Sequence, residues 1–132
     1  RAGTTTRYHT GDCISDEQAN FDARLPSGDC ARGGFQGSVM PVASFAPNAF
    51  GLYDMHGNVT EPTRDCWNSD YTDAPTIGIA WESGDCGRAP HRGGSWNSSD
   101  REIRSAARLR PTGALRDPDA GLRIAVSLLP ER

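Results

Sequence analysis

The segment Pro47–Thr63, PNAFGLYDMHGNVTEPT, carries more information about architecture than any other part of this chain. Asn48 is a good helix N-cap, and Gly57 is a good left-handed helix terminator. The sequence between them therefore predicts a short helix over 49–56, with Phe50 and Tyr53 three residues apart on one face. A strand is predicted to follow over 59–66, where β-forming residues lead up to a cysteine.

The same segment also holds a candidate metal site. A turn at Gly57 would bring the carboxylates of Asp54 and Glu61 together, with main-chain carbonyls between them. Ca²⁺ takes six to eight hard oxygen ligands in a flexible cage, so this set suits it. A helix cap followed by solvated acidic residues explains the same spacing, and the residues alone leave both interpretations open.

The rest of the chain predicts little regular structure. A second helix is predicted over 15–23, with Ser15 as its N-cap and acidic residues in its first turn. Short strands bounded by Gly, Pro or Asn are predicted over 39–45, 91–96, 103–110 and 121–126. The segment 66–90 is predicted to be a long loop held by its flanking cysteines. With 132 residues and neither repeat nor linker, the chain is predicted to be a single domain over 1–132.

Charge and composition argue against a nucleic-acid partner and against a membrane-spanning segment. The net charge of −3 argues against nucleic acid, because binding its backbone requires a positive field. No stretch approaches the 18 apolar residues of a membrane span. All 14 basic residues are arginines, and six of them lie between Arg101 and Arg123. Since arginine suits fixed carboxylate pairs, Arg104, Arg108 and Arg123 are expected to form a structural network, with substrate anchoring as the alternative.

Four cysteines, Cys13, Cys30, Cys66 and Cys86, match no zinc-binding spacing. The simplest hypothesis is two disulfides that close successive loops, Cys13 with Cys30 and Cys66 with Cys86. Four cysteines allow three pairings, and reduced thiols in a cytosolic protein are the alternative. If the bridges form, the compartment is oxidising, which predicts an extracellular or periplasmic location.

The three histidines, His9, His56 and His91, show no spacing that is diagnostic of a catalytic triad. His91 precedes a pair of glycines, so it is the histidine expected to line a cleft. The default for each is a solvated or core position.

Four motifs carry a family resemblance: FGLYDMHGNVTEPTRDCW, RGGSW, RSAARLR and DPDAGLRIA. Together they resemble the formylglycine-generating enzyme family, also called the sulfatase-modifying-factor family. The resemblance covers nearly the whole chain and matches the later part of a family domain, so the N-terminal part of that domain is expected to be missing. It implies an α+β, C-type-lectin-like fold with short twisted strands, few helices and long loops.

The resemblance also implies metal ligands. A structural Ca²⁺ would be held by the side chains of Asp54 and Glu61 and by the carbonyls of Gly57 and Val59. A further family calcium site would fall on four other positions, Asn20, Phe21, Gly33 and Phe35. At Gly33 the family offers a carboxylate, which this chain lacks.

Two departures from the family pattern bear on activity. Active members hold Cu(I) between two cysteines placed shortly after the GGS-aromatic motif, but the matching stretch 97–103 contains no cysteine. Soft thiolates are what Cu(I) requires, so no copper is expected here. Thr60 and Pro62 stand where many relatives carry tryptophan on both sides of Glu61. This exchange indicates an edge or a reshaped pocket.

These observations favour a calcium-stabilised binding or accessory module with a protein or peptide partner. One alternative is an oxidoreductase of a related branch, either formylglycine-generating or an iron enzyme that oxidises sulfur compounds, completed by residues outside this chain. The second alternative is a variable lectin-type ligand-display protein with 97–119 as its diversified face. Whether any catalysis remains is left open by the sequence.

Overall fold

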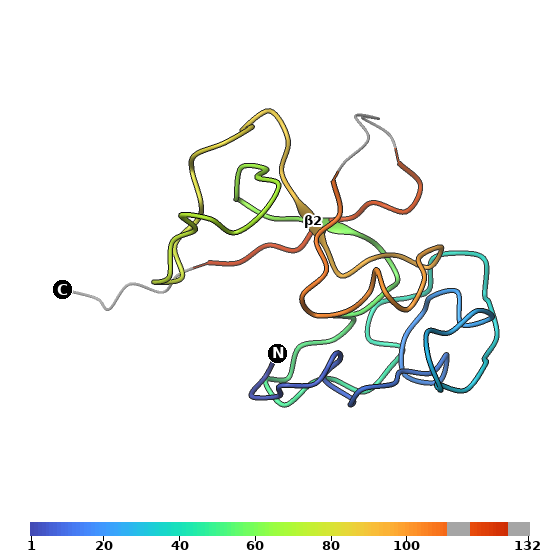
Figure 1. The fold of residues 1–132 in the computed structure, drawn as a ribbon. Helices are drawn as coiled ribbons and strands as arrows, with labels where there is room; N and C mark the ends of the chain where they lie inside the picture. The colour runs from blue at the N-terminus through green and yellow to red at the C-terminus, as the bar shows by residue number, and fades with distance from the viewer. Residues whose placement is uncertain (111–116, 127–132) are drawn as a thin grey trace.

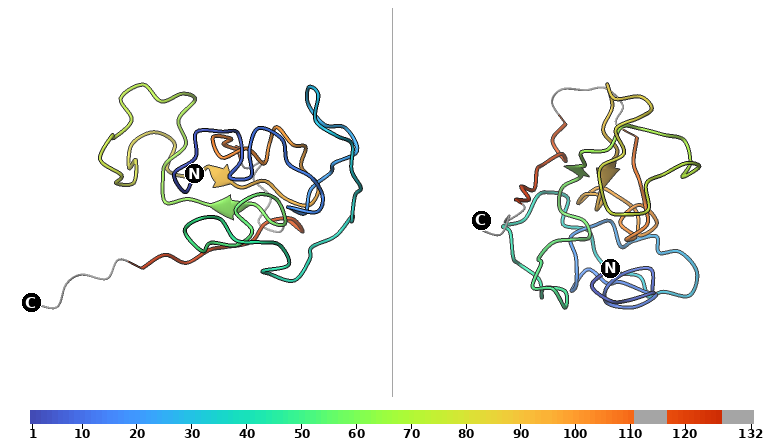
Figure 2. Two further views of the ribbon diagram at one scale, coloured as in Figure 1. Left: turned by 90° about the horizontal axis from the view of Figure 1, so that it is seen from below. Right: turned by 90° about the vertical axis from the view of Figure 1, so that its left-hand side faces the viewer.

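The computed structural model describes residues 1–110 and 117–126 (Figure 1). Its regular structure consists of β1 (Glu61–Pro62) and β2 (His91–Arg92). The two strands pair antiparallel, with Glu61 opposite Arg92 and Pro62 opposite His91 (Figure 2). The described ranges contain no helix, so the helical part of the predicted α+β class is not observed there. None of their elements is a helix long and apolar enough to cross a membrane.

Isolated bridges extend this two-stranded sheet on both sides. Thr60 pairs with Ala120, and His91 also pairs with Leu109. Predicted strand 59–66 is therefore confirmed only at its centre, and 91–96 only at its first two residues. Predicted strands 103–110 and 121–126 are reduced to single bridges next to one end of each. Predicted strand 39–45 does not form. Pro62 offers no amide donor and Gly93 turns left-handed at φ 85°, which explains why both strands stop after two residues.

The predicted helix over 15–23 is wrong beyond its first turn. Gln18 and Ala19 donate to the Ser15 carbonyl at 3.0 and 3.2 Å, as a nascent helix requires. Asn20, which follows this turn, does not continue it, because its carbonyl oxygen accepts from the amide of Asn58 at 2.8 Å. A tertiary hydrogen bond therefore replaces the second helical turn.

The predicted helix over 49–56 is also wrong. The Asn48 side chain accepts from the amides of Phe50 and Leu52 at 2.9 and 3.1 Å, which closes a side-chain turn that competes with a helix. Gly51 and Asp54 then adopt left-handed φ angles of 74° and 53°. Phe50 is 70% exposed, so no shared apolar face forms.

The core lies where the N-terminal third meets the segment after the glycine pair. It is built from six buried residues, Tyr8, Ile14, Ala19, Phe21, Ala23 and Ile103. The Tyr8 hydroxyl donates to the Asp100 carbonyl at 2.8 Å, which ties the two segments together. In Figure 1 the N-terminal segment, drawn in blue, accordingly gathers beside the orange part of the chain.

Both predicted disulfides are confirmed. Cys13 bonds to Cys30 and Cys66 to Cys86, with Cα atoms 5.5 and 4.2 Å apart. The second bridge closes the base of a loop that forms a separate lobe in Figure 1. Two disulfides are consistent with an oxidising compartment, extracellular or periplasmic.

Candidate functional site

The turn at Gly57 is fixed by its neighbours on both sides. Gly57 has φ 75°, and its amide donates to the Gly93 carbonyl at 2.8 Å. A Cβ atom at this position would overlap the main-chain oxygen of Asn20. Glycine is therefore required here both by conformation and by space. The neighbouring Asn58 is buried, and its amide group exchanges hydrogen bonds with the main chain of Met40 at 2.9 and 3.2 Å.

The carbonyl oxygens after the turn alternate between two environments. Those of Asn58 and Thr60 accept from Trp96 and Gly121 at 2.9 and 2.8 Å. Within the described residues, those of Gly57 and Val59 accept no hydrogen bond. Gly57 and Asn58 adopt left-handed φ angles of 75° and 66°, so these two oxygens belong to the turn and to its exit, just before β1. They are the two carbonyls that the sequence analysis assigned as metal ligands.

The two predicted carboxylate ligands are held at the ends of this segment. Asp54 Oδ2 accepts from the Ala43 amide at 2.7 Å. Glu61 is paired with Arg123, whose Nε and Nη2 donate to its two oxygens at 2.8 and 2.7 Å. Arg123 Nη2 also donates to the Tyr53 carbonyl at 3.0 Å. This pairing with Glu61 raises the pKa of Arg123 above its usual value.

A pocket of about 250 Å³ opens at this point of the surface. The pocket is lined by Val42, Ala43, Tyr53, Asp54, Asn58, Val59, Glu61, Leu122 and Arg123. Three of the four predicted ligands are among them, and Gly57 lies directly before Asn58 in the same turn.

The donor set at this pocket fits a hard cation. Two carbonyl oxygens without hydrogen bonds are available, and Asp54 Oδ1 takes part in no hydrogen bond within the described residues. Each Glu61 oxygen accepts one bond from Arg123, and a carboxylate oxygen can accept two. Oxygen-only donors of this kind suit Ca²⁺ better than a softer transition metal.

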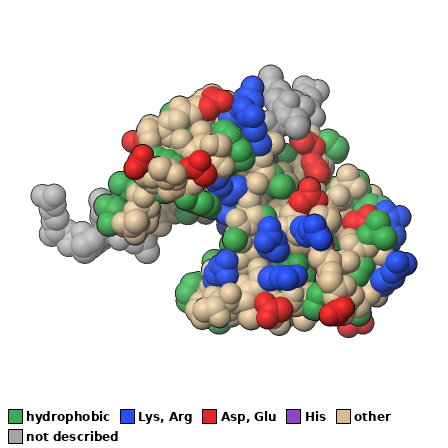
Figure 3. Space-filling view, in the orientation of Figure 1, with side chains coloured by type: hydrophobic (Ala, Val, Ile, Leu, Met, Phe, Trp, Pro, Cys, Tyr) green, Lys and Arg blue, Asp and Glu red, His purple; other side chains and the backbone are tan. Residues whose placement is uncertain are grey.

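Of the three arginines expected to pair with carboxylates, only Arg123 does so among the residues that the structure describes. Arg104 Nε donates to the Arg101 carbonyl at 2.8 Å. The Arg108 guanidinium carbon lies 4.2 Å from the ring centroid of Tyr71 and 5.2 Å from that of Trp67. These contacts join the loop closed by Cys66 and Cys86 to the segment that contains Arg108. Arginine side chains also gather over the middle of the face seen in Figure 3. Arg116 lies outside the described residues.

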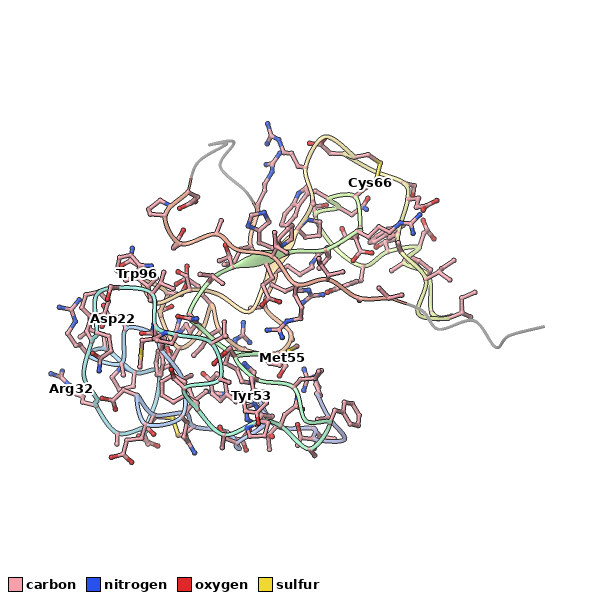
Figure 4. The ribbon with its side chains drawn as sticks, turned by 180° about the vertical axis from the view of Figure 1, so that it is seen from behind. Asp22, Arg32, Tyr53, Met55, Cys66 and Trp96 are labelled. Atoms are coloured by element: carbon pink, nitrogen blue, oxygen red, sulfur yellow. A yellow bond between two sulfur atoms is a disulfide. The ribbon has the colours of Figure 1, made fainter. Side chains whose placement is uncertain are left out.

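The stretch 97–103, which matches the copper-binding cysteines, is partly buried. Ser98 is 7% exposed, and Ile103 is completely buried. The nearby Ser95 is also completely buried, and its hydroxyl donates to Asp119 Oδ2 at 2.7 Å. In Figure 4, Trp96 lies at the end of the molecule far from Cys66. All four cysteines of the chain are in disulfides, so no thiolate is present near this stretch.

Two histidines meet at a second pocket, which sequence reasoning missed. The rings of His9 and His56 stack with centroids 5.0 Å apart. His56 Nε2 accepts from the His9 amide at 3.1 Å, so its Nδ1 carries the hydrogen and donates to the Ile103 carbonyl at 2.7 Å. Both rings line a pocket of about 200 Å³, whereas His91, the histidine expected at a cleft, does not. Because 47 residues separate His9 from His56, no local sequence pattern could have signalled the contact.

Comparison with known proteins identifies the family of this site. Residues 1–128 match the model of the "Sulfatase-modifying factor enzyme 1-like domain" family. The chain belongs to this family. The formylglycine-generating enzyme of Mus musculus is 32% identical over 113 residues, which cover 83% of this chain and 30% of that protein.

The chain is similar to two further proteins. The "Inactive C-alpha-formylglycine-generating enzyme 2" of Bos taurus is 36% identical over 88 residues, 64% of this chain and 29% of that protein. The solved structure of PvdO from Pseudomonas aeruginosa is 36% identical, with a TM-score of 0.57 over 79% of this chain and 35% of that one. The chain thus spans about a third or less of the length of these relatives.

Proposed function

We propose that this chain is a calcium-stabilised, C-type-lectin-like binding or accessory module of the family, without a copper centre. One observation carries the proposal. None of the four cysteines of the chain lies in 97–103. All four form disulfides, Cys13 with Cys30 and Cys66 with Cys86. Cu(I) bound in the family's manner needs two thiolates, and a serine hydroxyl is too hard a donor to replace one.

The calcium part of the proposal rests on Asp54, Gly57, Val59 and Glu61. These residues offer two carboxylates and two carbonyls free of hydrogen bonds within the described residues, beside one pocket. When bound, the ion would supply positive charge that joins the turn to the Glu61 strand. Its role is structural, since the same atoms position the chain that runs on toward Thr63 and the disulfide-closed loop.

An oxidoreductase of a related branch is the alternative, and the paired histidines favour it. His9 and His56 stand side by side at a pocket, as ligands of an iron centre would. Against this, both ring nitrogens of His56 are already engaged in hydrogen bonds. An iron site would therefore need His9 together with donors supplied from elsewhere.

The lectin-type display protein is less well supported. Its variable face would run over 97–119, of which 111–116 lie outside the described residues. Within the described part, Ser98, Asp100, Ile103 and Ala107 are buried. Variation at buried positions disturbs packing, so the described part of this segment could diversify only at the exposed positions between these four residues.

Metal analysis and an activity assay test the proposal together. The purified, disulfide-intact protein is expected to carry about one or more equivalents of calcium, with neither copper nor iron in stoichiometric amount. Incubation with copper and a cysteine-containing peptide is expected to yield no formylglycine. Stoichiometric copper or iron, or formylglycine formation, would contradict the proposal that this chain is a binding or accessory module.

Thermal melting with and without a calcium chelator tests the metal residues. Removal of an ion present at 100 times its dissociation constant costs about 2.7 kcal/mol of stability, so the midpoint is expected to fall. In the Asp54→Asn variant, the chelator should no longer lower the melting midpoint through this site. Glu82→Gln is the matched control, because its exposed side chain pairs with Arg64, away from Asp54 and Glu61. An unchanged wild-type midpoint contradicts the calcium site.

A further inference from the structure

Three arginines line one opening at the surface, with a volume of about 370 Å³. They are Arg101, Arg104 and Arg108, and none of them forms an ion pair with a carboxylate among the residues that the structure describes. We call this opening the arginine groove. A chain whose net charge is −3 therefore concentrates positive charge at one place.

Two of the three guanidinium groups are held through Nε alone. Arg101 Nε donates to the Ser27 hydroxyl at 2.7 Å, and Arg104 Nε donates to the Arg101 carbonyl at 2.8 Å. Within the described residues, Nη1 and Nη2 of both side chains donate no hydrogen bond. Both side chains are exposed, so these terminal nitrogens are available to a ligand.

The third guanidinium group lies against aromatic rings. Arg108 stands over the rings of Tyr71 and Trp67, and Trp67 itself lines the groove. The Tyr71 hydroxyl accepts from Arg92 Nη2 at 2.8 Å, which holds the ring from its other end. Contact with aromatic rings leaves the charge of the guanidinium in place. The wall of the groove therefore combines a fixed positive charge with apolar surface.

The acidic side chains nearest the groove are engaged with neutral groups. Glu102 lines the groove, but its Oε2 accepts from the amide and the hydroxyl of Ser99 at 2.8 and 2.9 Å, as in a capping box. The exposed Asp70 accepts from the Thr72 amide at 2.8 Å. Hydrogen bonds from Thr72 lower the pKa of Asp70, and the charge of Arg108 adds to this effect. One lining carboxylate against three guanidinium groups leaves the groove positive.

The groove continues into a second opening. Arg104 also lines the pocket of about 200 Å³ beside the stacked histidines, together with Arg1 and Arg92. Asp54 and Glu61 line that pocket too, so positive charge is greatest at the arginine groove. Two openings that share a side chain form a path longer than either one. Such a path suits an extended chain better than a compact small molecule.

We infer that the arginine groove binds an acidic peptide segment of a partner protein. The planar fork of arginine donates to both oxygens of a carboxylate, so glutamate and aspartate side chains match it. A long polyanion such as nucleic acid would extend onto the rest of the surface, where the excess of acidic residues repels it. A short acidic segment would contact the arginines alone. The inference rests on the proposed role as a binding module, and it adds the chemistry of the partner.

Fluorescence anisotropy with two labelled peptides tests the inference on the disulfide-intact protein. One peptide alternates glutamate with glycine, and the other carries glutamine in place of each glutamate. The glutamate peptide is expected to bind about tenfold more tightly or better, because only its side chains are charged. This preference should shrink as the ionic strength rises above about 0.1 M, where charges are screened beyond about 10 Å.

A double variant places the binding at the groove. Arg101→Gln combined with Arg104→Gln is expected to weaken binding of the glutamate peptide by about tenfold or more. Arg32→Gln combined with Arg64→Gln is the matched control, since it removes the same charge at two exposed arginines that do not line the groove. The affinity of this control should stay within about twofold of the wild type.

Several results would overturn the inference. They are equal binding of the two peptides, full binding by the groove variant, and tighter binding of a sulfated oligosaccharide or single-stranded DNA that the groove variant loses. If the groove variant does not fold, amide chemical shifts of the wild-type protein replace it. Shifts over 101–108 on addition of the glutamate peptide support the groove, and shifts confined to other segments overturn it. The calcium and copper contents do not depend on these results, so the two proposals fail separately.

Discussion

Arg123 and Glu61, 62 residues apart, form a two-pronged ion pair with nitrogen–oxygen distances of 2.8 and 2.7 Å. The pair joins the C-terminal segment to β1 beside the candidate calcium turn. The side chains are 36% and 20% exposed, so solvent screens part of the interaction.

Arg123→Lys is expected to destabilise the fold by about 1 kcal/mol, because lysine cannot donate to both oxygens in a fixed plane. Urea denaturation measures the change. Arg64→Lys is the matched control, since its pair with Glu82 is 84% and 69% exposed. Its effect should stay within about 0.5 kcal/mol. Equal effects at both positions would contradict a structural role for the Arg123 pair.

Gly57→Ala is expected to destabilise the protein by roughly 3 kcal/mol, because left-handed strain adds to overlap with the Asn20 carbonyl. Gly51→Ala measures the left-handed strain by itself. Gly51 has nearly the same φ, 74°, but a Cβ there meets nothing within 4 Å. It should cost only about 1 kcal/mol. Denaturation midpoints of the two variants that coincide would show that the close approach to Asn20 is unimportant.

The stacked histidines predict a loss of stability in mild acid. Burial lowers the pKa of His56 below its ordinary value of 6.5, and it outweighs the hydrogen bond to the Ile103 carbonyl, which acts in the opposite direction. Neutral His56 is thus favoured by folding. Its contribution is complete above pH 6.5 and is lost as the pH falls from there through the lowered pKa.

Melting midpoints between pH 7.5 and about 5 measure this loss. His56→Gln is expected to make the profile shallower, because glutamine binds no proton in that range. Some slope is expected to remain from His9, whose pKa burial also lowers. His91→Gln, at a histidine that faces Thr60 and not His9, should leave the slope in place. A slope as steep in His56→Gln as in the wild type would contradict the role of His56.

Removing the second disulfide with Cys66→Ser and Cys86→Ser is expected to cost about 3 kcal/mol, as a loop of 20 residues predicts. The Tyr8–Asp100 contact lies in another part of the chain, so the core should survive. Near-ultraviolet circular dichroism and denaturation midpoints measure both effects. Loss of the whole near-ultraviolet signal would show that the core around Tyr8 depends on the second disulfide.

Local sequence rules succeeded where the deciding interaction is local. The two disulfides join cysteines that are neighbours among the cysteines, and the left-handed turn at Gly57 needs only its glycine. The pairing of Arg123 with a carboxylate was also expected. The calcium ligands remain a prediction, although three of them line one pocket.

The rules failed where distant segments compete for the backbone. The carbonyl of Asn20 bonds to Asn58 and so ends the helix that Ser15 begins. The Asn48 side chain captures two amides that a helix over 49–56 would have used. Neither the His9–His56 stack nor the Asp16–Gly34 bond follows from periodicity, since each joins positions without a shared pattern.

Both disulfides are local, and neither crosses the stretch between Cys30 and Cys66. A protease that nicks the chain once in this stretch therefore yields two oxidised fragments with no covalent link between them. Their association would rest on contacts such as Asn58 with Asn20 and Tyr8 with Asp100. Reassembly of the two fragments from separate solutions would then report directly on the strength of the non-covalent interface within this one domain.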